Sequence, residues 1–201
     1  MMTSRSEYRL LHRQDNADER MSRFGNKIGL ISDEQLHAVE KKYASVSAEL
    51  DRMEHTHLAP SSELDNLLRD RGTAEVHNGC SLADLLRRPQ LCYDDLAPFD
   101  PERPLLSHAV RNQVEIRLKY EGYIRRQLKQ VEEFTKMEQK RLPENMDYSG
   151  IQGLRLEARE KLQRIRPENF GQASRISGVS PADIAVLMIY VESRRGENGQ
   201  R

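Results

Sequence analysis

Four arginines and a tyrosine near the N-terminus carry the clearest binding chemistry in this sequence. They are Arg5, Arg9, Arg13 and Arg20, with Tyr8 among them. Guanidinium groups suit phosphate oxygens, and an interleaved aromatic ring suits an unstacked RNA base. The same arginines could instead pair with neighbouring carboxylates or dock onto another domain. Spacing alone favours this second interpretation.

A second unusual stretch lies near the C-terminus, where small and polar residues alternate between positions 171 and 178. Its small residues would let another backbone approach closely, while Gln172, Ser174 and Arg175 offer directional polar contacts. The simpler interpretation is helix packing, ended by a glycine cap at Gly178. Both interpretations make the stretch a contact surface.

Catalytic signatures are absent from the sequence. None of the 11 glycines forms the Gly-x-Gly-x-x-Gly turn that binds a dinucleotide, and no phosphate-binding loop is present. His55 and His57 would point to different faces of a helix, which disfavours a metal pair. Cys80 and Cys92 form neither a Cys-x-x-Cys nor a zinc pattern. We therefore expect this chain to hold no metal, cofactor or catalytic residue of its own.

Composition points to a polar, helical protein of the cytoplasm. Apolar residues make up 37% of the 201 residues, charged residues 32% and aromatic residues only 5%, with a formal net charge of zero. Residues 1–27 and 111–201 are basic on balance, whereas residues 28–110 are acidic. Such segregation allows basic surfaces toward the two ends of the chain, although ordinary solvated helix faces would give the same counts. The longest apolar run, residues 184–191, is too short to cross a bilayer.

The elements that would position these residues are helices. Apolar residues recur at three- and four-residue steps, and Ser32, Ser61 or Ser62, and Ser180 precede such segments as caps. The expected helices cover residues 33–56, 62–71, 81–87, 107–141, 155–166, 167–176 and a last one that begins at 181. No segment alternates with a period of two, and the proline-rich connector 93–104 allows at most one helical turn.

The predicted fold is all-α, a long-helix bundle followed by a small C-terminal three-helix subdomain. We expect residues 1–30 to be a linker segment and residues 31–146 to form the bundle. Residues 147–195 would form the subdomain, and residues 196–201 a tail. Gly122 interrupts the long helix and suggests a close helix crossing there, because a helical glycine costs about 1 kcal/mol relative to alanine.

Several long motifs resemble one known family. Its pattern is matched by Thr3–Leu11, Arg13–Asp18, Arg20 and Gly29-Leu30, then by Leu85–Pro89, Lys119–Ile124, Asp147-Tyr148 and Gly171–Val179. The motifs occur in family order over nearly the whole chain. On these residues the sequence is similar to the C-terminal helical region of the MnmG (GidA) flavoproteins.

The resemblance implies a role in tRNA modification. Proteins of this family use FAD, NADH and a folate donor, together with the GTPase MnmE, to modify carbon 5 of the tRNA wobble uridine. The resemblance implies that the flavin domain of the parent lies outside this sequence. It further implies a parent homodimer within a heterotetramer, and a helical region that docks the GTPase and helps to bind tRNA.

Carried over residue by residue, the resemblance makes Arg5, Arg9, Arg13, Arg20 and Lys119 candidate tRNA contacts. The candidate contacts for the GTPase partner are Tyr120, Tyr123, Gln172, Ser174 and Arg175. Lys119, Tyr120, Tyr123 and Arg175 fit either the partner or the tRNA surface. The alternative function is a structural helical adaptor that does not bind nucleic acid.

Overall fold

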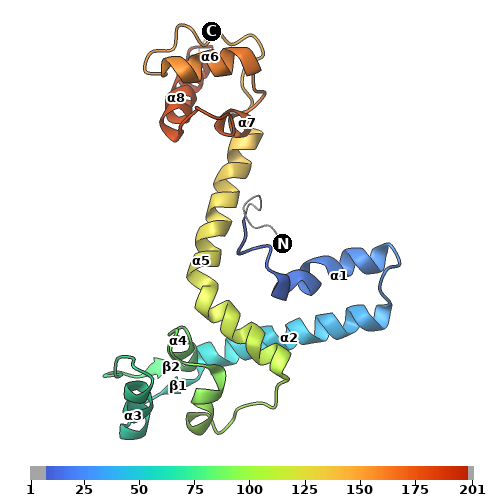
Figure 1. Cartoon of the computed structure of the whole chain (residues 1–201), viewed down its shortest axis with the longest axis vertical. Coiled ribbons are helices and arrows are strands. Elements are labelled where there is room, and N and C mark those ends of the chain that lie inside the picture. The colour runs from blue at the N-terminus through green and yellow to red at the C-terminus, as the bar shows by residue number, and fades with distance from the viewer. Residues whose placement is uncertain (1–7, 199–201) are drawn as a thin grey trace. The chain divides into compact units, whose positions relative to one another are not determined.

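The computed structural model describes the backbone of residues 8–198 and the side chains of residues 8–194 (Figure 1). Arg5 therefore lies outside the described residues. The helices are α1 (Ala17–Lys27), α2 (Asp33–His55), α3 (Ser62–Asp70), α4 (Leu82–Leu86), α5 (His108–Gln139), α6 (Leu156–Ile165), α7 (Phe170–Ser174) and α8 (Pro181–Asn198), with the 3-10 helices η2 (Gln14–Asn16) and η3 (Tyr93–Phe99). The strands β1 (His57–Leu58) and β2 (Cys80–Ser81) form one small antiparallel pair.

The predicted all-α class is confirmed, and the main helices begin and end close to their expected positions. Ser32 caps α2 through a capping box in which its hydroxyl accepts from the Gln35 amide at 3.2 Å. Ser61 caps α3 by accepting from the Leu64 amide at 3.2 Å. The two-residue strands were not predicted, because a pair this short has no readable periodicity.

The chain packs as two compact units, residues 1–127 and 128–201, each with its own core. The packing divides α5 itself, whereas the sequence analysis places the boundary between residues 146 and 147. The reason is that Met137, near the end of α5, packs against the core of the second unit. The three helices α6, α7 and α8 all belong to this second unit.

In unit 1, α1 and α2 form a helical hairpin (Figure 1). The Tyr43 hydroxyl donates to Asp18 at 2.6 Å, and Lys42 forms a 2.8 Å ion pair with the same carboxylate. Asp18 thus ties α1 to α2. Behind the hairpin lies a core of aliphatic side chains from α2, α3, α4 and α5, including the fully buried Val46, Leu68, Leu85 and Val114.

The connector that contains η3 is more regular than predicted, with seven residues in a 3-10 helix rather than at most one turn. Buried side chains of α2 hold it in place. Glu49 accepts a 2.6 Å hydrogen bond from the Tyr93 hydroxyl, while Arg52 pairs with both Glu49 and Asp100, at 2.8 Å and 2.5 Å. These long-range partners could not be read from local sequence.

In unit 2, α7 is shorter than the helix expected over 167–176, and that expectation is wrong at its start. Residues 140–142 pair with residues 168–170: the Leu142 amide donates to the Glu168 carbonyl at 2.8 Å, and the Phe170 amide to the Lys140 carbonyl at 3.2 Å. This extended pairing uses the segment after Pro167. The helix begins only after Asn169, whose side chain accepts from the Gln172 amide at 2.8 Å.

Gly171 is the position in unit 2 where a side chain would not fit. A Cβ atom there would lie 2.4 Å from the Glu138 Cγ and 3.2 Å from the Glu138 Cα. The absence of a side chain lets α7 pack directly on the end of α5. Close approach, one interpretation of the 171–178 stretch, therefore occurs within the chain itself.

The stability of unit 2 is expected to fall at acidic pH because of Asp183. Its buried carboxylate accepts from Arg155 at 2.5 Å and from the Ser180 hydroxyl at 2.6 Å. The hydrogen bond from Arg155, helped by Ser180, holds the pKa of Asp183 well below its ordinary value. A lowered folded-state pKa stabilises the fold above the unfolded value of about 3.9, and this contribution is lost as the pH falls through the folded value.

We therefore expect Asp183→Asn to lower the thermal midpoint of unit 2 at pH 7, with the difference from wild type narrowing below about pH 4. Thermal unfolding followed by circular dichroism between pH 2.5 and 7 measures this. A deficit that stays constant across the range would show that the charge of Asp183 is not what stabilises the start of α8.

Candidate functional site

The structure uses two of the N-terminal arginines to shape the segment before α1. Arg13 pairs with Asp15 at 3.0 Å and donates to the Leu10 carbonyl, while Arg20 donates to the Asn16 side chain at 3.0 Å. Burial would raise the pKa of Asp15, but hydrogen bonds from Arg13 and other donors hold that pKa below its ordinary value. Arg9 is exposed. Among the described candidates, Arg13 and Arg20 thus have structural partners, while Arg9 faces solvent.

The three candidates of the C-terminal stretch also have partners inside unit 2. Gln172 accepts from the Glu168 amide at 2.8 Å, and the Ser174 hydroxyl donates to the Gly171 carbonyl at 2.8 Å. Arg175 pairs with Glu138 at 2.9 Å, and its guanidinium lies 4.5 Å from the centre of the Phe134 ring. Arg175 thus contacts α5, whereas Gln172 and Ser174 bond within residues 168–174. Gln172 and Arg175 remain exposed at their edges.

The candidate residues on α5, by contrast, lie close together at the surface. Lys119, Tyr120 and Tyr123 lie within one and a half turns, and the two tyrosine side chains are among the exposed large residues of the chain, at 43% and 59%. Their ring centres are 6.4 Å apart. The structure thus brings Lys119, Tyr120 and Tyr123 together on an accessible helix surface.

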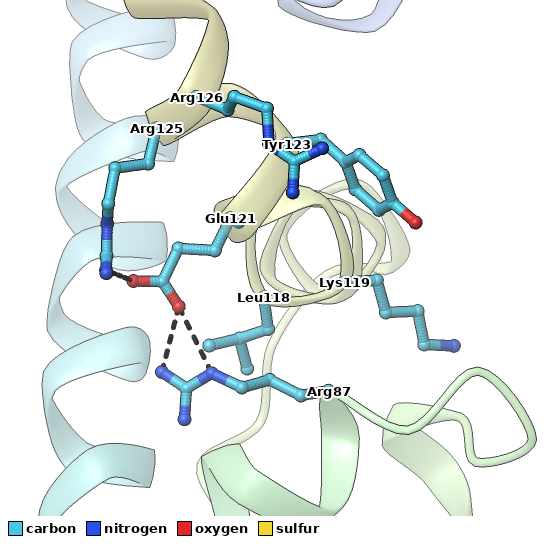
Figure 2. Close-up of a pocket in the computed structure, with 8 residues that line it drawn as sticks. Arg87, Leu118, Lys119, Glu121, Tyr123, Arg125 and Arg126 are labelled. Atoms are coloured by element: carbon cyan, nitrogen blue, oxygen red, sulfur yellow. Dashed lines mark hydrogen bonds and ion pairs between the residues drawn. The ribbon is translucent and has the colours of Figure 1, made fainter. Parts of the chain in front are cut away.

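Beside these residues the surface is hollowed into a pocket of about 440 Å³, called the α5 pocket below (Figure 2). Its lining consists of Arg87, Leu118, Lys119, Glu121, Gly122, Tyr123, Arg125 and Arg126. Arg87 comes from the end of α4, and the other residues come from α5. Four of the eight lining residues are cationic, whereas Glu121 is the single acidic one.

The carboxylate of Glu121 is already matched by two arginines. It accepts from Arg87 at 3.0 Å and from Arg125 at 2.5 Å, as the dashed lines of Figure 2 show. Arg87 also binds Glu54 and Asp84 outside the pocket. Burial alone would lower the pKa of Arg87, but Glu54 and Glu121 raise it, so this guanidinium is a fixed cation. Arg87 therefore forms one side of the pocket, with its guanidinium held by ion pairs to three carboxylates.

The cations on the other side of the pocket are less constrained. Lys119 has a single carboxylate partner, Glu115, at 3.3 Å. Arg126 is exposed and forms no ion pair within residues 8–194. Arg126 was not among the predicted site residues. Its position seven residues after Lys119, two helical turns along the same face, was a readable signal.

Unit 2 carries a separate, apolar hollow of about 530 Å³ between the 150–152 loop and α8. It is lined by Gly150, Ile151, Gln152, Val186, Ile189, Tyr190 and Ser193. Ile189 is 69% exposed, so this large aliphatic side chain has little packing inside unit 2. Ile189 was not among the contact residues predicted from the sequence.

No described group of His, Cys, Asp and Glu side chains could hold a metal ion, and no described helix is long and apolar enough to cross a membrane. The described residues also lack the fold that binds a dinucleotide. Dinucleotide folds require parallel strands followed by a glycine-rich turn, and the one sheet of the described chain has two strands of two residues each.

Comparison with known proteins assigns the two parts of the chain to one family. Residues 33–128 match the model of the tRNA modifying enzyme MnmG/GidA C-terminal helical domain, and residues 130–201 match that of the MnmG/GidA C-terminal helical bundle. The boundary between the two matches falls next to the division between the two units at residues 127 and 128.

Similar proteins cover nearly the whole chain. The tRNA uridine 5-carboxymethylaminomethyl modification enzyme MnmG of Caldicellulosiruptor saccharolyticus is 49% identical over 97% of the chain, and that of Lachnoclostridium phytofermentans is 50% identical over 97%. The chain spans 31% of the length of each. A solved structure of Aquifex aeolicus GidA, in its form II crystal, has a TM-score of 0.62 and 35% identity, covering 94% of this chain and 29% of that one. This chain belongs to the MnmG/GidA family of tRNA-modifying enzymes and corresponds to its C-terminal helical region.

Proposed function

We propose that this chain is the macromolecule-binding region of an MnmG-type enzyme, and that it contacts tRNA through unit 1 and a GTPase partner of the MnmE type through unit 2. The parent would transfer a carboxymethylaminomethyl or aminomethyl group to carbon 5 of the wobble uridine. The flavin and nicotinamide would be held by parts of the parent that this chain does not span. The parent would act as a homodimer within a heterotetramer, in the cytoplasm.

The observation that carries the tRNA contact is the exposed face of α5. Lys119 and Arg126 flank Tyr123, whose ring is 59% exposed, at a pocket lined by four cationic side chains. Cations beside an open aromatic ring can bind phosphate and stack an unpaired base at the same time. Arg9, which is exposed, remains a second candidate for a phosphate contact. Arg13 and Arg20 would support the contact by ordering the segment around Arg9.

Titration with tRNA at two salt concentrations tests this proposal. If binding neutralises about three phosphates, the logarithm of the association constant should fall with the logarithm of salt with a slope of about −2 to −3. Fluorescence anisotropy of labelled tRNA at about 50 and 200 mM salt measures the slope. Absence of binding at the lower concentration would favour the structural adaptor.

A further inference from the structure

Gly122 has no explanation in the packing of the chain. A glycine inside a helix costs about 1 kcal/mol relative to alanine, and such a cost usually reflects a neighbour that needs the space. At Gly171 that neighbour is Glu138. At Gly122, by contrast, a Cβ atom would meet no described atom within 4 Å. The close helix crossing suggested by the sequence is therefore not found among the described residues.

The open space over Gly122 belongs to the α5 pocket. Gly122 lines this pocket between Lys119 and Tyr123, and it is itself exposed. Without a side chain at Gly122, the backbone of α5 is accessible in the pocket, whose lining also includes Arg87 (Figure 2). A ligand can therefore reach the helix backbone here, with a cation or an aromatic ring to either side.

We propose that the α5 pocket holds one unstacked nucleotide of the tRNA, an inference that rests on the proposed tRNA-binding function. The ribose and the base edge would lie over Gly122, where a side chain would block them. The base would stack on the exposed ring of Tyr123. The 5′ or 3′ phosphate would be bound by Arg126, with Lys119 as the second cation.

Charge and shape favour this occupant over a helix of a partner protein. The lining combines four cations with a single carboxylate, and two of those cations already neutralise Glu121. An anionic ligand would pair with Arg126, and Lys119, whose one carboxylate partner is Glu115 at 3.3 Å, would be the second cation. The volume of about 440 Å³ lies in the range of sites that enclose a small ligand or a single nucleotide. A protein helix would meet this lining only with an acidic face.

Gly122→Leu tests the role of the pocket in binding without destabilising the fold. Leucine has a higher helix propensity than glycine, and the site has room for it, so the thermal midpoint should stay equal or rise. Its side chain would nevertheless fill the pocket, and the dissociation constant for tRNA should rise at least about tenfold. Asn112→Leu, an exposed change on α5 ten residues before Gly122 and outside the pocket lining, is the matched control and should leave binding unchanged.

Two variants of Tyr123 test the stacking. Tyr123→Ala should weaken tRNA binding about tenfold, whereas Tyr123→Phe should retain the affinity because it keeps the ring. Anisotropy titrations of the 201-residue chain and its variants give these constants, with circular dichroism as the check on helix content. The pattern that supports the proposal is loss in Gly122→Leu and Tyr123→Ala with retention in Tyr123→Phe and Asn112→Leu.

The remaining outcomes contradict the proposed nucleotide site, and each of them points to a different alternative. If the unmodified chain binds no tRNA, the proposed function fails and the pocket assignment fails with it. Salt-dependent binding that survives both Gly122→Leu and Tyr123→Ala would keep the function and place the tRNA elsewhere. If Gly122→Leu instead abolishes binding of the GTPase and spares tRNA, the pocket is a protein-docking site.

Discussion

Replacing Glu49 with alanine is expected to destabilise unit 1 by about 3 kcal/mol, which is a large part of the stability of a small domain. The Glu49 side chain is almost fully buried, and it accepts hydrogen bonds from Arg52 and from the Tyr93 hydroxyl. Burial, reinforced by the bond to Glu49, raises the pKa of Tyr93 to about 12. Alanine would leave that buried hydroxyl without its acceptor and Arg52 with only Asp100.

Hydrogen–deuterium exchange of the α2 and η3 amides measures the loss in the intact chain, because the buried network joins these two elements. Asp51→Ala is the matched control on α2: its side chain is 79% exposed, so the change should cost less than about 0.5 kcal/mol. Glu49→Gln, which preserves the volume and one acceptor, should fall between the two. Equal protection in Glu49→Ala and Asp51→Ala would contradict the role given to this network.

The second large effect is expected in the binding of the GTPase partner. Ile189→Asp should weaken binding by about thirtyfold or more if Ile189 is one of the few central residues that dominate an interface, since each of these contributes about 2 kcal/mol or more. Ile189 is 69% exposed at the rim of the apolar hollow formed by α8 and the 150–152 loop. The same exposure means that aspartate is tolerated by the fold.

Leu156→Asp provides the control in unit 2. Leu156 is 68% exposed, lies on α6 and does not line the hollow. Both substitutions therefore replace an exposed aliphatic side chain with aspartate, and only their positions differ. Binding of the purified GTPase to immobilised chain, measured by biolayer interferometry, should be lost only in Ile189→Asp. Deletion of the residues after position 147 should abolish it. Retained binding after that deletion would move the GTPase surface out of unit 2.

The fold was predictable where local rules decide it. Ser32 with Gln35, and Ser180 before Pro181, are local signals, and both helices begin where these residues place them. The start of α7 was not predictable, because residues 168–170 pair with residues 140–142, a contact between segments far apart in sequence. Long-range pairing of this kind overrides a local preference such as that of Pro167 for a first helical turn.

The candidate site was predictable only in part, and for a related reason. Lys119, Tyr120 and Tyr123 could be placed on one helix from their spacing, together with Gly122 as an anomaly. The sequence could not show that Arg13 binds Asp15 or that Arg175 binds Glu138, since ion pairs depend on tertiary geometry. Nor could it show that the space over Gly122 is open, which depends on what the rest of the chain leaves uncovered.

The proposed function requires that one chain has two binding surfaces, one in unit 1 for tRNA and one in unit 2 for the GTPase. Sedimentation velocity on a mixture of the chain, the GTPase and labelled tRNA tests both surfaces at once. At low salt we expect the chain, the GTPase and the tRNA to sediment together as one complex. The tRNA should be missing from this complex when the chain carries Gly122→Leu, and the GTPase should be missing when it carries Ile189→Asp. Migration of the chain alone, with neither component in its boundary, would contradict the account.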